Sequence, residues 1–265
     1  MITGAGSGIG KHLALAAEKE GALVCYTDRN PEALQALQAL LQEDGHRGYL
    51  CDSADISSID TLWAALQRDN VQVDALVNCS GSKASKIHFS DTTPEQWGTA
   101  YAANVQGPAY LTQLVTRAMT KDKRTGSILF ISSVHGQITG GWPHYSASKA
   151  ALNMLVKELA LELGGDGIRV NAIAPGWTAE PEEPGADYFE HAPLGQRAIP
   201  PEYISRACIF LLSNYHSAYT TGTCLTVDAG VSLRSYRTPA IPPEGDPHTR
   251  WPLNSGHSQW QKDRQ

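Results

Sequence analysis

The sequence predicts an α/β fold in which a parallel sheet of about seven strands carries helices on both faces. Along most of the 265-residue chain, short apolar runs that end in turn residues alternate with segments of helical periodicity. Such alternation is typical of a doubly wound parallel sheet. A glycine-rich segment at residues 3–10 is followed at once by a helical pattern, and this order favours the same class.

Length and composition are consistent with one globular domain. A single α/β domain can reach 265 residues, and the fractions of hydrophobic (42%) and charged (18%) residues are ordinary for a globular protein. The formal net charge is −6, and no cluster of lysine and arginine is present. Nucleic acids and anionic membrane surfaces are therefore not expected as partners.

The cysteines and the apolar runs indicate a cytoplasmic protein. The five cysteines have neither zinc nor redox-motif spacing, so we interpret them as small buried hydrophobic residues of a reducing compartment, and we expect no metal site. The chain starts Met-Ile-Thr-Gly without a signal-peptide pattern, and no apolar run reaches the roughly 18 residues of a membrane helix. The cysteines are Cys25, Cys51, Cys79, Cys208 and Cys224.

Five apolar runs are expected to form buried strands, because continuous apolar runs bounded by turn residues are typical of parallel sheets. They span residues 23–27, 75–78, 127–131, 168–173 and 225–227.

Helices are expected between these runs. Leucine stripes occur at 34–41 and 62–66. A helix start is predicted at Thr93, which is followed by Pro94 and, three residues after the cap, by Gln96. The strongest helical pattern covers residues 150–163, and a glycine pair ends it.

Two segments depart from the alternation. Residues 177–200 contain several prolines and acids without a clear period, which predicts a long mobile lid over the site. Residues 231–265 contain five prolines in polar sequence and are expected to form a flexible tail. We therefore expect a catalytic domain over 1–230, with the lid inside it, and a tail over 231–265.

The composition of the expected lid bears on what it covers. Its acids disfavour strongly anionic ligands, and nearby aromatic residues offer apolar or stacking surface. Alternatively, the acids only solvate an exposed loop. The acids are Glu180, Glu182, Glu183 and Asp187, and the aromatic residues are Trp142, Trp177, Tyr188 and Phe189.

The glycine-rich segment has the form of a phosphate-binding loop. Its glycines allow backbone N–H groups to approach a pyrophosphate, and a helix N-terminus follows. Asp28 ends the next expected strand, at the distance where a carboxylate accepts the ribose hydroxyls of NAD. Arg29 follows directly and is able to offset the repulsion of a 2′-phosphate, so NADP stays open as an alternative.

The chain resembles the short-chain dehydrogenase/reductase family, in its shorter single-domain branch, over residues 1–230. Eight motifs follow in the family's order. They are the loop at 3–10, Asp52, Asn78-Cys79-Ser80-Gly81, Asn104, Ile131-Ser132-Ser133-Val134-His135-Gly136, Tyr145-Ser146-Ala147-Ser148-Lys149, Pro175-Gly176 with Thr178, and Thr221-Gly222 with Val227-Asp228-Ala229-Gly230.

The resemblance implies a Rossmann-like, NAD(P)-dependent oxidoreductase that interconverts a secondary alcohol and a ketone. With the acids and aromatic residues of the expected lid, a neutral ketone, sugar or polyol is favoured as the substrate. It implies a homodimer or homotetramer, in agreement with helices around 104–119 and 150–163 that are apolar on more than one face. The implied catalytic residues are Asn104, Ser133, Tyr145 and Lys149. The implied cofactor-binding residues are Thr3, Gly4, Gly8, Ile9, Gly10, Asp28, Asp52, Asn78, Gly81, Tyr145, Lys149, Pro175, Gly176 and Thr178.

The chemistry of the expected pair also follows from the residues themselves. Tyrosine has an ordinary pKa of about 10, so it needs a nearby cation to act as a base near neutral pH. Lys149 lies one helical turn after Tyr145, and the two side chains therefore share a helix face. The family's spacing of thirteen residues before the tyrosine reaches Ser132, whereas the local motif indicates Ser133, which we expect to be the catalytic serine.

The first strand is expected to be very short, since only Met1 and Ile2 precede the loop. A short central strand removes hydrogen bonds from its neighbours, and this predicts low stability and weak cofactor binding. It also leaves an alternative function, a catalytically weak nucleotide-binding interaction protein.

Overall fold

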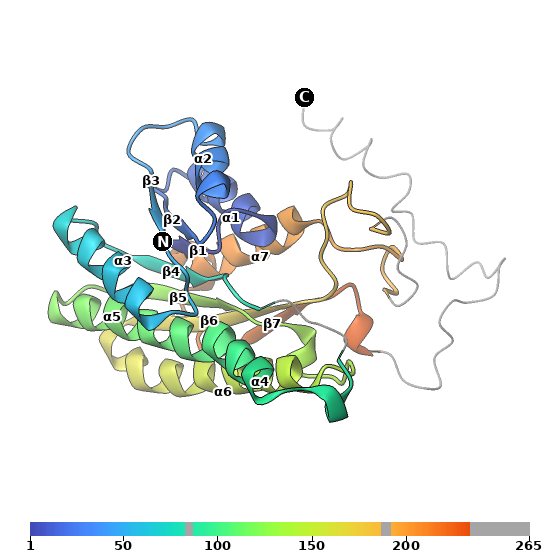
Figure 1. Cartoon of the computed structure of the whole chain (residues 1–265). Helices are drawn as coiled ribbons and strands as arrows, with labels where there is room; N and C mark the ends of the chain where they lie inside the picture. Colours follow the sequence, from blue (N-terminus) through green and yellow to red (C-terminus); the bar gives the residue numbers. More distant parts are fainter. Residues whose placement is uncertain (83–86, 187–191, 234–265) are drawn as a thin grey trace.

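A computed structural model describes residues 1–82, 87–186 and 192–233 (Figure 1). Their core is a seven-stranded parallel sheet in the order β3-β2-β1-β4-β5-β6-β7, which confirms the expected class. The strands are β1 (Ile2–Thr3), β2 (Cys25–Asp28), β3 (Arg47–Leu50), β4 (Ala75–Asn78), β5 (Gly126–Ile131), β6 (Ile168–Pro175) and β7 (Cys224–Val227).

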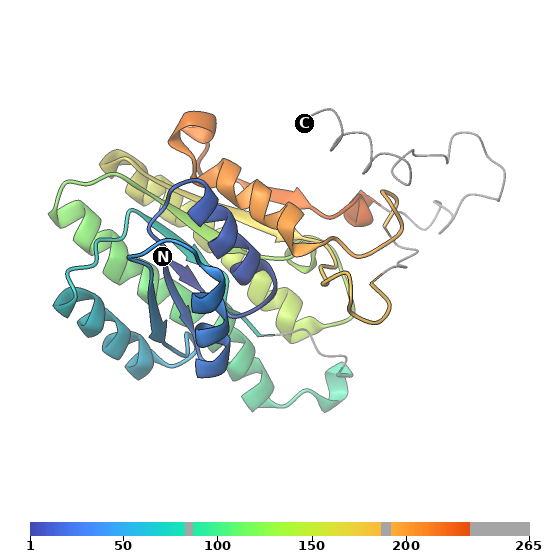
Figure 2. The same cartoon turned by 90° about the horizontal axis from the view of Figure 1, so that it is seen from above.

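Helices cover both faces of the sheet (Figures 1 and 2). One face carries α1 (Gly8–Lys19), α2 (Pro31–Leu40) and α7 (Pro201–Leu212), followed by the short α8 (Asn214–Ser217). The other face carries α3 (Ile56–Arg68), α4 (Pro94–Tyr101), α5 (Gly107–Lys121) and α6 (Pro143–Leu163). In the part of the chain that the structure describes, no helix is long and apolar enough to cross a membrane.

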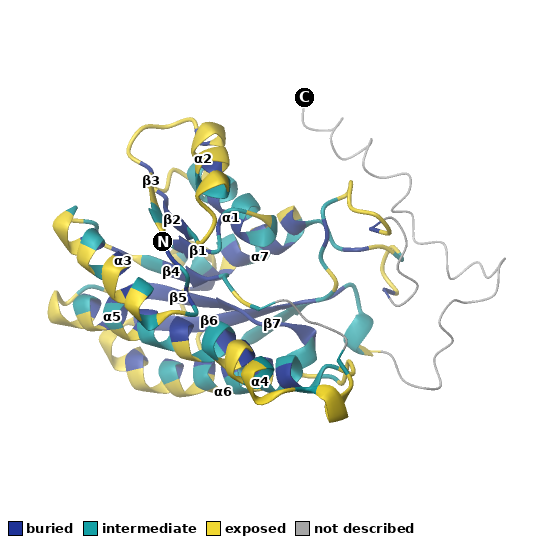
Figure 3. Cartoon of the chain, viewed as in Figure 1, coloured by how far each residue is buried: buried dark blue, intermediate teal, exposed yellow. Residues whose placement is uncertain are grey.

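The central strands are apolar because helices cover them on both sides. Every residue of β5 and β6 is buried, and the two strands pair in parallel from Gly126 with Ile168 to Ile131 with Ile173. Figure 3 shows the resulting pattern, with a buried sheet and helices that expose only their outer faces. Two hydrophobic cores follow, one on each face of the sheet.

The helix boundaries follow local capping chemistry. At α4 the Thr93 side chain accepts from the Gln96 N–H, and the Gln96 side chain accepts from the Thr93 N–H, so the predicted capping box is confirmed. Helix α6 ends at Leu163, before the predicted glycine pair. It begins at Pro143, seven residues earlier than its apolar pattern, because its first two turns carry polar residues of the site.

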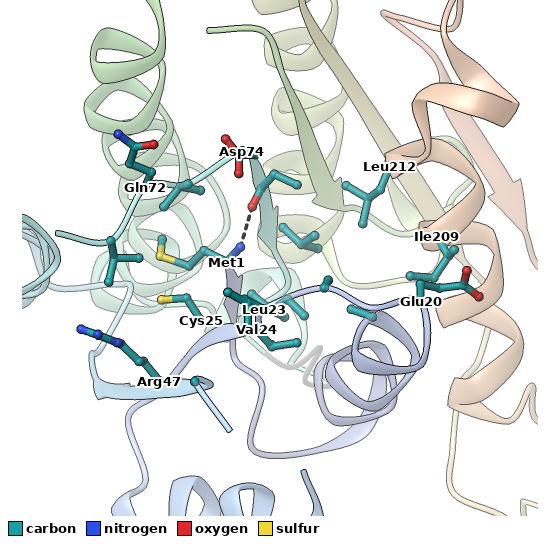
Figure 4. A pocket seen from close by; sticks show the side chains of 18 of the residues that line it. Met1, Glu20, Leu23, Val24, Cys25, Arg47, Gln72, Asp74, Ile209 and Leu212 are labelled. Atoms are coloured by element: carbon teal, nitrogen blue, oxygen red, sulfur yellow. Dashed lines mark hydrogen bonds between the residues drawn. The ribbon is translucent and has the colours of Figure 1, made fainter. Parts of the chain in front are cut away.

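Strand β1 has only two residues, as expected, although it lies between β2 and β4. Ile2 pairs with Tyr26 on one side and with Val77 on the other. A cavity of about 1040 Å³ opens at its amino end, lined by Met1, Leu23, Val24, Val73 and their neighbours (Figure 4). The Met1 ammonium donates to the carbonyl of Ala75 at the floor of this cavity, and burial lowers the pKa of the ammonium.

Filling this cavity is expected to stabilise the protein. About five apolar residues added before Met1 extend β1 into the space between β2 and β4. Fully burying one large apolar side chain contributes about 1.5–3 kcal/mol, and 1 kcal/mol raises the melting temperature by about 2–4 °C in a domain of this size. We expect melting temperature and NAD affinity both to rise, as measured by calorimetry and cofactor titration.

An extension of five glycine and serine residues is the matched control, because it adds length without apolar surface. If the apolar and the Gly/Ser forms melt together and bind NAD equally, the length of β1 does not limit stability.

Candidate active site

The glycine loop joins β1 to α1 at the carboxyl edge of the sheet. A Cβ at Gly10 would lie 2.2 Å from the Gly4 carbonyl oxygen, so a side chain here would push the loop away from the helix. Gly8 has φ +48°, and nothing lies within 4 Å of the place a Cβ would take. The loop is therefore packed tightly on its inner side and open where α1 begins.

The amino end of α1 has the properties of an anion site. Its N-cap residue Ser7 makes no side-chain capping hydrogen bond, and the first turn contains no acid. The first N–H groups of a helix lack intrahelical acceptors and bear a partial positive charge. The open space at Gly8 and these N–H groups fit the pyrophosphate of a dinucleotide.

Thr3 braces the loop against the end of β4. Its hydroxyl accepts from the N–H groups of Cys79 (3.1 Å) and Ser80 (3.2 Å) and lies 2.9 Å from the Ser80 hydroxyl. The Ile9 carbonyl accepts a hydrogen bond from Ser205 of α7 at 3.4 Å, which ties the loop to the covering helix. Both residues were predicted to bind cofactor, and in this geometry they hold the loop that would do so.

Asp28 lies at the end of β2 and against the glycine loop. Its Oδ2 accepts from the Gly6 N–H at 2.9 Å, and its Oδ1 accepts from the Asn30 N–H at 3.0 Å. A carboxylate offers about four acceptor positions, so capacity for two ribose hydroxyls is left. Asp52, after β3, accepts from the Ala54 N–H at 2.9 Å and caps its own turn.

The end of β4 leads into the catalytic region. The Asn78 side chain is buried and donates to Thr112 of α5 at 3.0 Å, so it anchors the strand to that helix. Gly81 lies against the amide of Asn104, where a side chain would not fit.

The structure brings Tyr145, Lys149 and Ser133 together at the carboxyl end of β5. The Lys149 Nζ lies 5.7 Å from the centre of the Tyr145 ring and donates to the Ile131 carbonyl at 2.9 Å. The Ser133 side chain lowers the pKa of the Tyr145 phenol. Ser132 instead directs its hydroxyl to Asn153 of α6, at 2.6 Å.

Burial governs the ionisation of Tyr145 and Lys149 in the protein alone. Burial raises the pKa of Tyr145 above its usual value, and the Ser133 hydrogen bond only partly opposes this. Burial also lowers the pKa of Lys149 to about 8. Desolvation is the larger effect in the protein alone, because both groups are buried. The expected lowering of the tyrosine pKa by Lys149 together with an oxidised nicotinamide stays a prediction.

Asn104 occupies a π-helical turn, Ala102–Gln106, between α4 and α5. Its Nδ2 donates to the hydroxyls of Ser82 and Ser148, each at 2.9 Å, and its Oδ1 accepts from the Ser82 N–H at 3.0 Å. The extra residue of a π-turn is often found at functional sites. Here the π-turn directs the buried Asn104 amide toward α6. The amide contacts Ser148, which directly precedes Lys149 in the chain.

The segment after β6 docks on α1. Gly176 follows Pro175, the last residue of β6, and its N–H donates to the Val227 carbonyl at 3.0 Å. The Thr178 hydroxyl donates to the Gly176 carbonyl at 3.3 Å. Glu180 forms an ion pair with Lys11 (3.1 Å), and its other oxygen lies 3.0 Å from the His12 ring nitrogen.

The lid is less acidic than its sequence suggests, because Glu180 is paired with Lys11. Burial raises the pKa of Glu180, and its contacts with Lys11 and His12 lower the pKa overall. The Lys11 ammonium balances the charge of the carboxylate. Glu182 and Glu183 are exposed. Asp187, Tyr188 and Phe189 lie outside the described residues.

An aromatic wall flanks Tyr145. The His135 ring lies 4.4 Å from the Trp142 ring and 5.9 Å from the Tyr145 ring, centre to centre. Burial lowers the pKa of His135, so this ring is neutral at neutral pH and adds no charge to the site. Within residues 1–82, 87–186 and 192–233, no three His, Cys, Asp or Glu side chains are grouped as a metal site requires.

The chain is similar to several known proteins. Residues 4–232 match the family model described as enoyl-(acyl carrier protein) reductase. The 3-oxoacyl-(acyl-carrier-protein) reductase of Thermotoga maritima is 34% identical over 245 residues, covering 88% of this chain and 97% of that protein. The D-threitol dehydrogenase of Mycolicibacterium smegmatis is 32% identical over 244 residues, covering 88% and 92%.

A solved structure is similar as well. An oxidoreductase of the short-chain dehydrogenase/reductase family from Burkholderia thailandensis superposes with a TM-score of 0.79 at 32% identity, covering 88% of this chain and 92% of that one.

The buried Lys149 predicts a pH dependence of stability. Because its pKa in the folded protein is about 8, against about 10.4 for an exposed lysine, folding disfavours the charged form. The unfolded chain binds more protons between these two values, so stability rises as pH increases from about 8 to 10. The rise in melting temperature over this range should be smaller in Lys149→Met. An Nζ titration by NMR with a midpoint above pH 10 would contradict the prediction.

Proposed function

Since the chain belongs to the short-chain dehydrogenase/reductase family and is therefore an NAD(P)-dependent oxidoreductase of alcohol and ketone groups, we propose that Tyr145 exchanges the proton of this reaction. The convergence of Tyr145, Lys149 and Ser133 beside the glycine loop carries the proposal. The alternative of a catalytically weak nucleotide-binding protein gains no support from the relatives.

The proton and the hydride follow separate routes. When bound, the nicotinamide supplies or accepts the hydride at the substrate carbon. In ketone reduction the Tyr145 phenol gives its proton to the substrate oxygen, and in alcohol oxidation its phenolate takes that proton back. The raised pKa of Tyr145 keeps it protonated at neutral pH, which suits it to act as an acid.

Ser133 orients the substrate oxygen in this scheme. Its Oγ accepts from the His135 N–H at 3.2 Å, so its own proton is free to be donated to the substrate oxygen or to the Tyr145 oxygen. Lys149 holds a proton near Tyr145 and is placed to bind a ribose hydroxyl. Asn104 fixes Ser82 and Ser148 around Lys149 and supports the path of that proton to solvent.

NAD is the proposed cofactor, with NADP as the alternative. The Asp28 carboxylate at the glycine loop accepts ribose hydroxyls and repels a 2′-phosphate. Arg29 is the adjacent residue that favours NADP if it turns toward the same place.

A small neutral ketone, sugar or polyol is the proposed substrate. The D-threitol dehydrogenase among the relatives acts on a polyol, and the neutral His135 and Trp142 rings offer apolar surface beside Tyr145. The 3-oxoacyl reductase of Thermotoga maritima supports a second candidate, a 3-oxoacyl substrate. The exposed Glu182 and Glu183 disfavour that second, anionic class of substrate.

A homodimer or homotetramer is the proposed assembly. Helix α6 exposes Met154 (55%) and Leu161 (83%) while its opposite face packs on the sheet. A helix with apolar residues on both sides needs cover on both.

Removal of the Tyr145 oxygen tests the acid–base assignment. Tyr145→Phe should keep the fold and cofactor affinity but lower turnover about 10²–10⁴-fold, the usual contribution of general acid–base catalysis. Turnover is followed by nicotinamide absorbance on a panel of secondary alcohols. Lys149→Ala serves for comparison, because it should lower turnover and also weaken cofactor binding. Turnover of Tyr145→Phe within about tenfold of the parent would exclude this role.

Cofactor choice is tested at Asp28. Asp28→Ala removes the charge that repels a 2′-phosphate, so the ratio of NAD to NADP efficiency should fall. The ratio of kcat/KM for the two cofactors is the measurement, with exposed Glu32→Ala on α2 as a control. A parent enzyme that already prefers NADP would show that Arg29 prevails.

A further inference from the structure

One face of α6 carries three polar residues, each one helical turn apart. They are Tyr145, Lys149 and Asn153, and each contacts a different residue at the carboxyl end of β5. Lys149 donates to the carbonyl of Ile131, Asn153 accepts from the hydroxyl of Ser132, and Tyr145 lies against Ser133. Three consecutive residues of the strand end are thus held by three consecutive turns of one helix.

Asn153 is the most highly connected of the three. Its Oδ1 accepts from Ser132 (2.6 Å) and from the Cys224 thiol of β7 (3.5 Å), and its Nδ2 donates to the Gly136 carbonyl (3.3 Å). Both lone-pair positions of the amide oxygen are therefore in use. The amide links the end of β5, the turn Val134–Gly136 and strand β7.

The turn that carries Ser133 has little freedom beside this amide. A Cβ at Gly136 would lie 2.6 Å from the Asn153 Nδ2 and 2.9 Å from the Lys149 carbonyl oxygen, so the turn sits directly on α6. At its other end, the Ser132 N–H donates to the Ile173 carbonyl of β6 at 2.7 Å. Ser133 thus lies between two anchored residues, and Asn153 bonds to both Ser132 and Gly136.

We propose that Asn153 is a positioning residue of the reaction, which fixes the turn from Ser132 to Gly136 and so places the Ser133 hydroxyl against Tyr145. Asn153 does not touch the reacting atoms; it acts through Ser133. This proposal rests on the proposed roles of Ser133 and Tyr145.

The consequence for catalysis follows from the place of this turn beside Tyr145, where the His135 ring lies 5.9 Å from the tyrosine ring. A hydrogen bond from the Ser133 hydroxyl to the Tyr145 oxygen favours the phenolate and opposes the effect of burial on the tyrosine pKa. When the turn loosens, the bond is lost, and the pKa of Tyr145 rises. In alcohol oxidation, which needs the phenolate, the rising limb of the pH–rate profile then moves to higher pH.

The experiment compares Asn153→Ala, Ser132→Ala and the double variant. Each single variant should lower kcat for alcohol oxidation about 10- to 100-fold, as small misplacements of catalytic groups do, with an unchanged Kd for the cofactor. The rising limb should move up by about 0.5–1 pH unit, the effect of one lost hydrogen bond. Both changes remove the bond between Ser132 and Asn153, and Asn153→Ala also removes the bond to Gly136, so the double variant should resemble Asn153→Ala.

Val156→Ala is the matched control, since it removes buried methyl groups from the same helix without touching the turn. It should lower the melting temperature but leave kcat and the pH limb unchanged. If Asn153→Ala fails to fold, Ser132→Ala carries the test alone.

Three results would overturn the positioning role: a kcat within twofold of the parent, a lower kcat with an unmoved pH limb, or additive effects in the double variant. Tyr145→Phe is measured alongside. If it abolishes turnover while Asn153→Ala leaves the limb in place, only the role of Asn153 fails. If Tyr145→Phe retains turnover, the proposed function itself fails.

Discussion

The parallel hydrogen-bond ladder of the sheet is the constraint on which the site depends. Because all seven strands run in one direction, their carboxyl ends meet at one edge, and the loops that follow them are brought together there. Thr3, Asp28, Ser133 and Pro175 come from different strand ends yet lie along this edge. The strand order and register therefore bring these segments close together, and their direct contacts only adjust their positions.

Within the site, burial determines how Lys149 and Tyr145 ionise. Lys149 is 5% exposed, and one of its three donors is used by the Ile131 carbonyl. Burial therefore lowers the pKa of Lys149 and raises that of Tyr145, so it favours the uncharged form of both side chains. A bound group that adds positive charge or hydroxyl acceptors would reverse part of this balance. The protein alone is thus prepared as an acid, and conversion to a base depends on what binds beside it.

The sequence was sufficient where the signal was local. The apolar run 75–78 coincides with β4, and Thr93 with Gln96 predicted the capping box of α4. The sequence did not predict the start of α6 at Pro143, where the first turns are polar, nor the contacts between segments far apart in the chain. Asn153 meets Ser132 across 21 positions, and Glu180 meets His12 across 168. Neither partner has a periodicity or motif that would reveal the other, so only the folded chain identifies these contacts.

The uncapped start of α1 has a practical consequence for work with this protein. A helix end without a capping side chain, without an acid in its first turn and with open space at Gly8 does not distinguish a dinucleotide from any other small oxyanion. If the cofactor binds there as proposed, sulfate and inorganic phosphate would compete for the same N–H groups. Cofactor affinities measured in phosphate buffer or ammonium sulfate would then include the displacement of that anion.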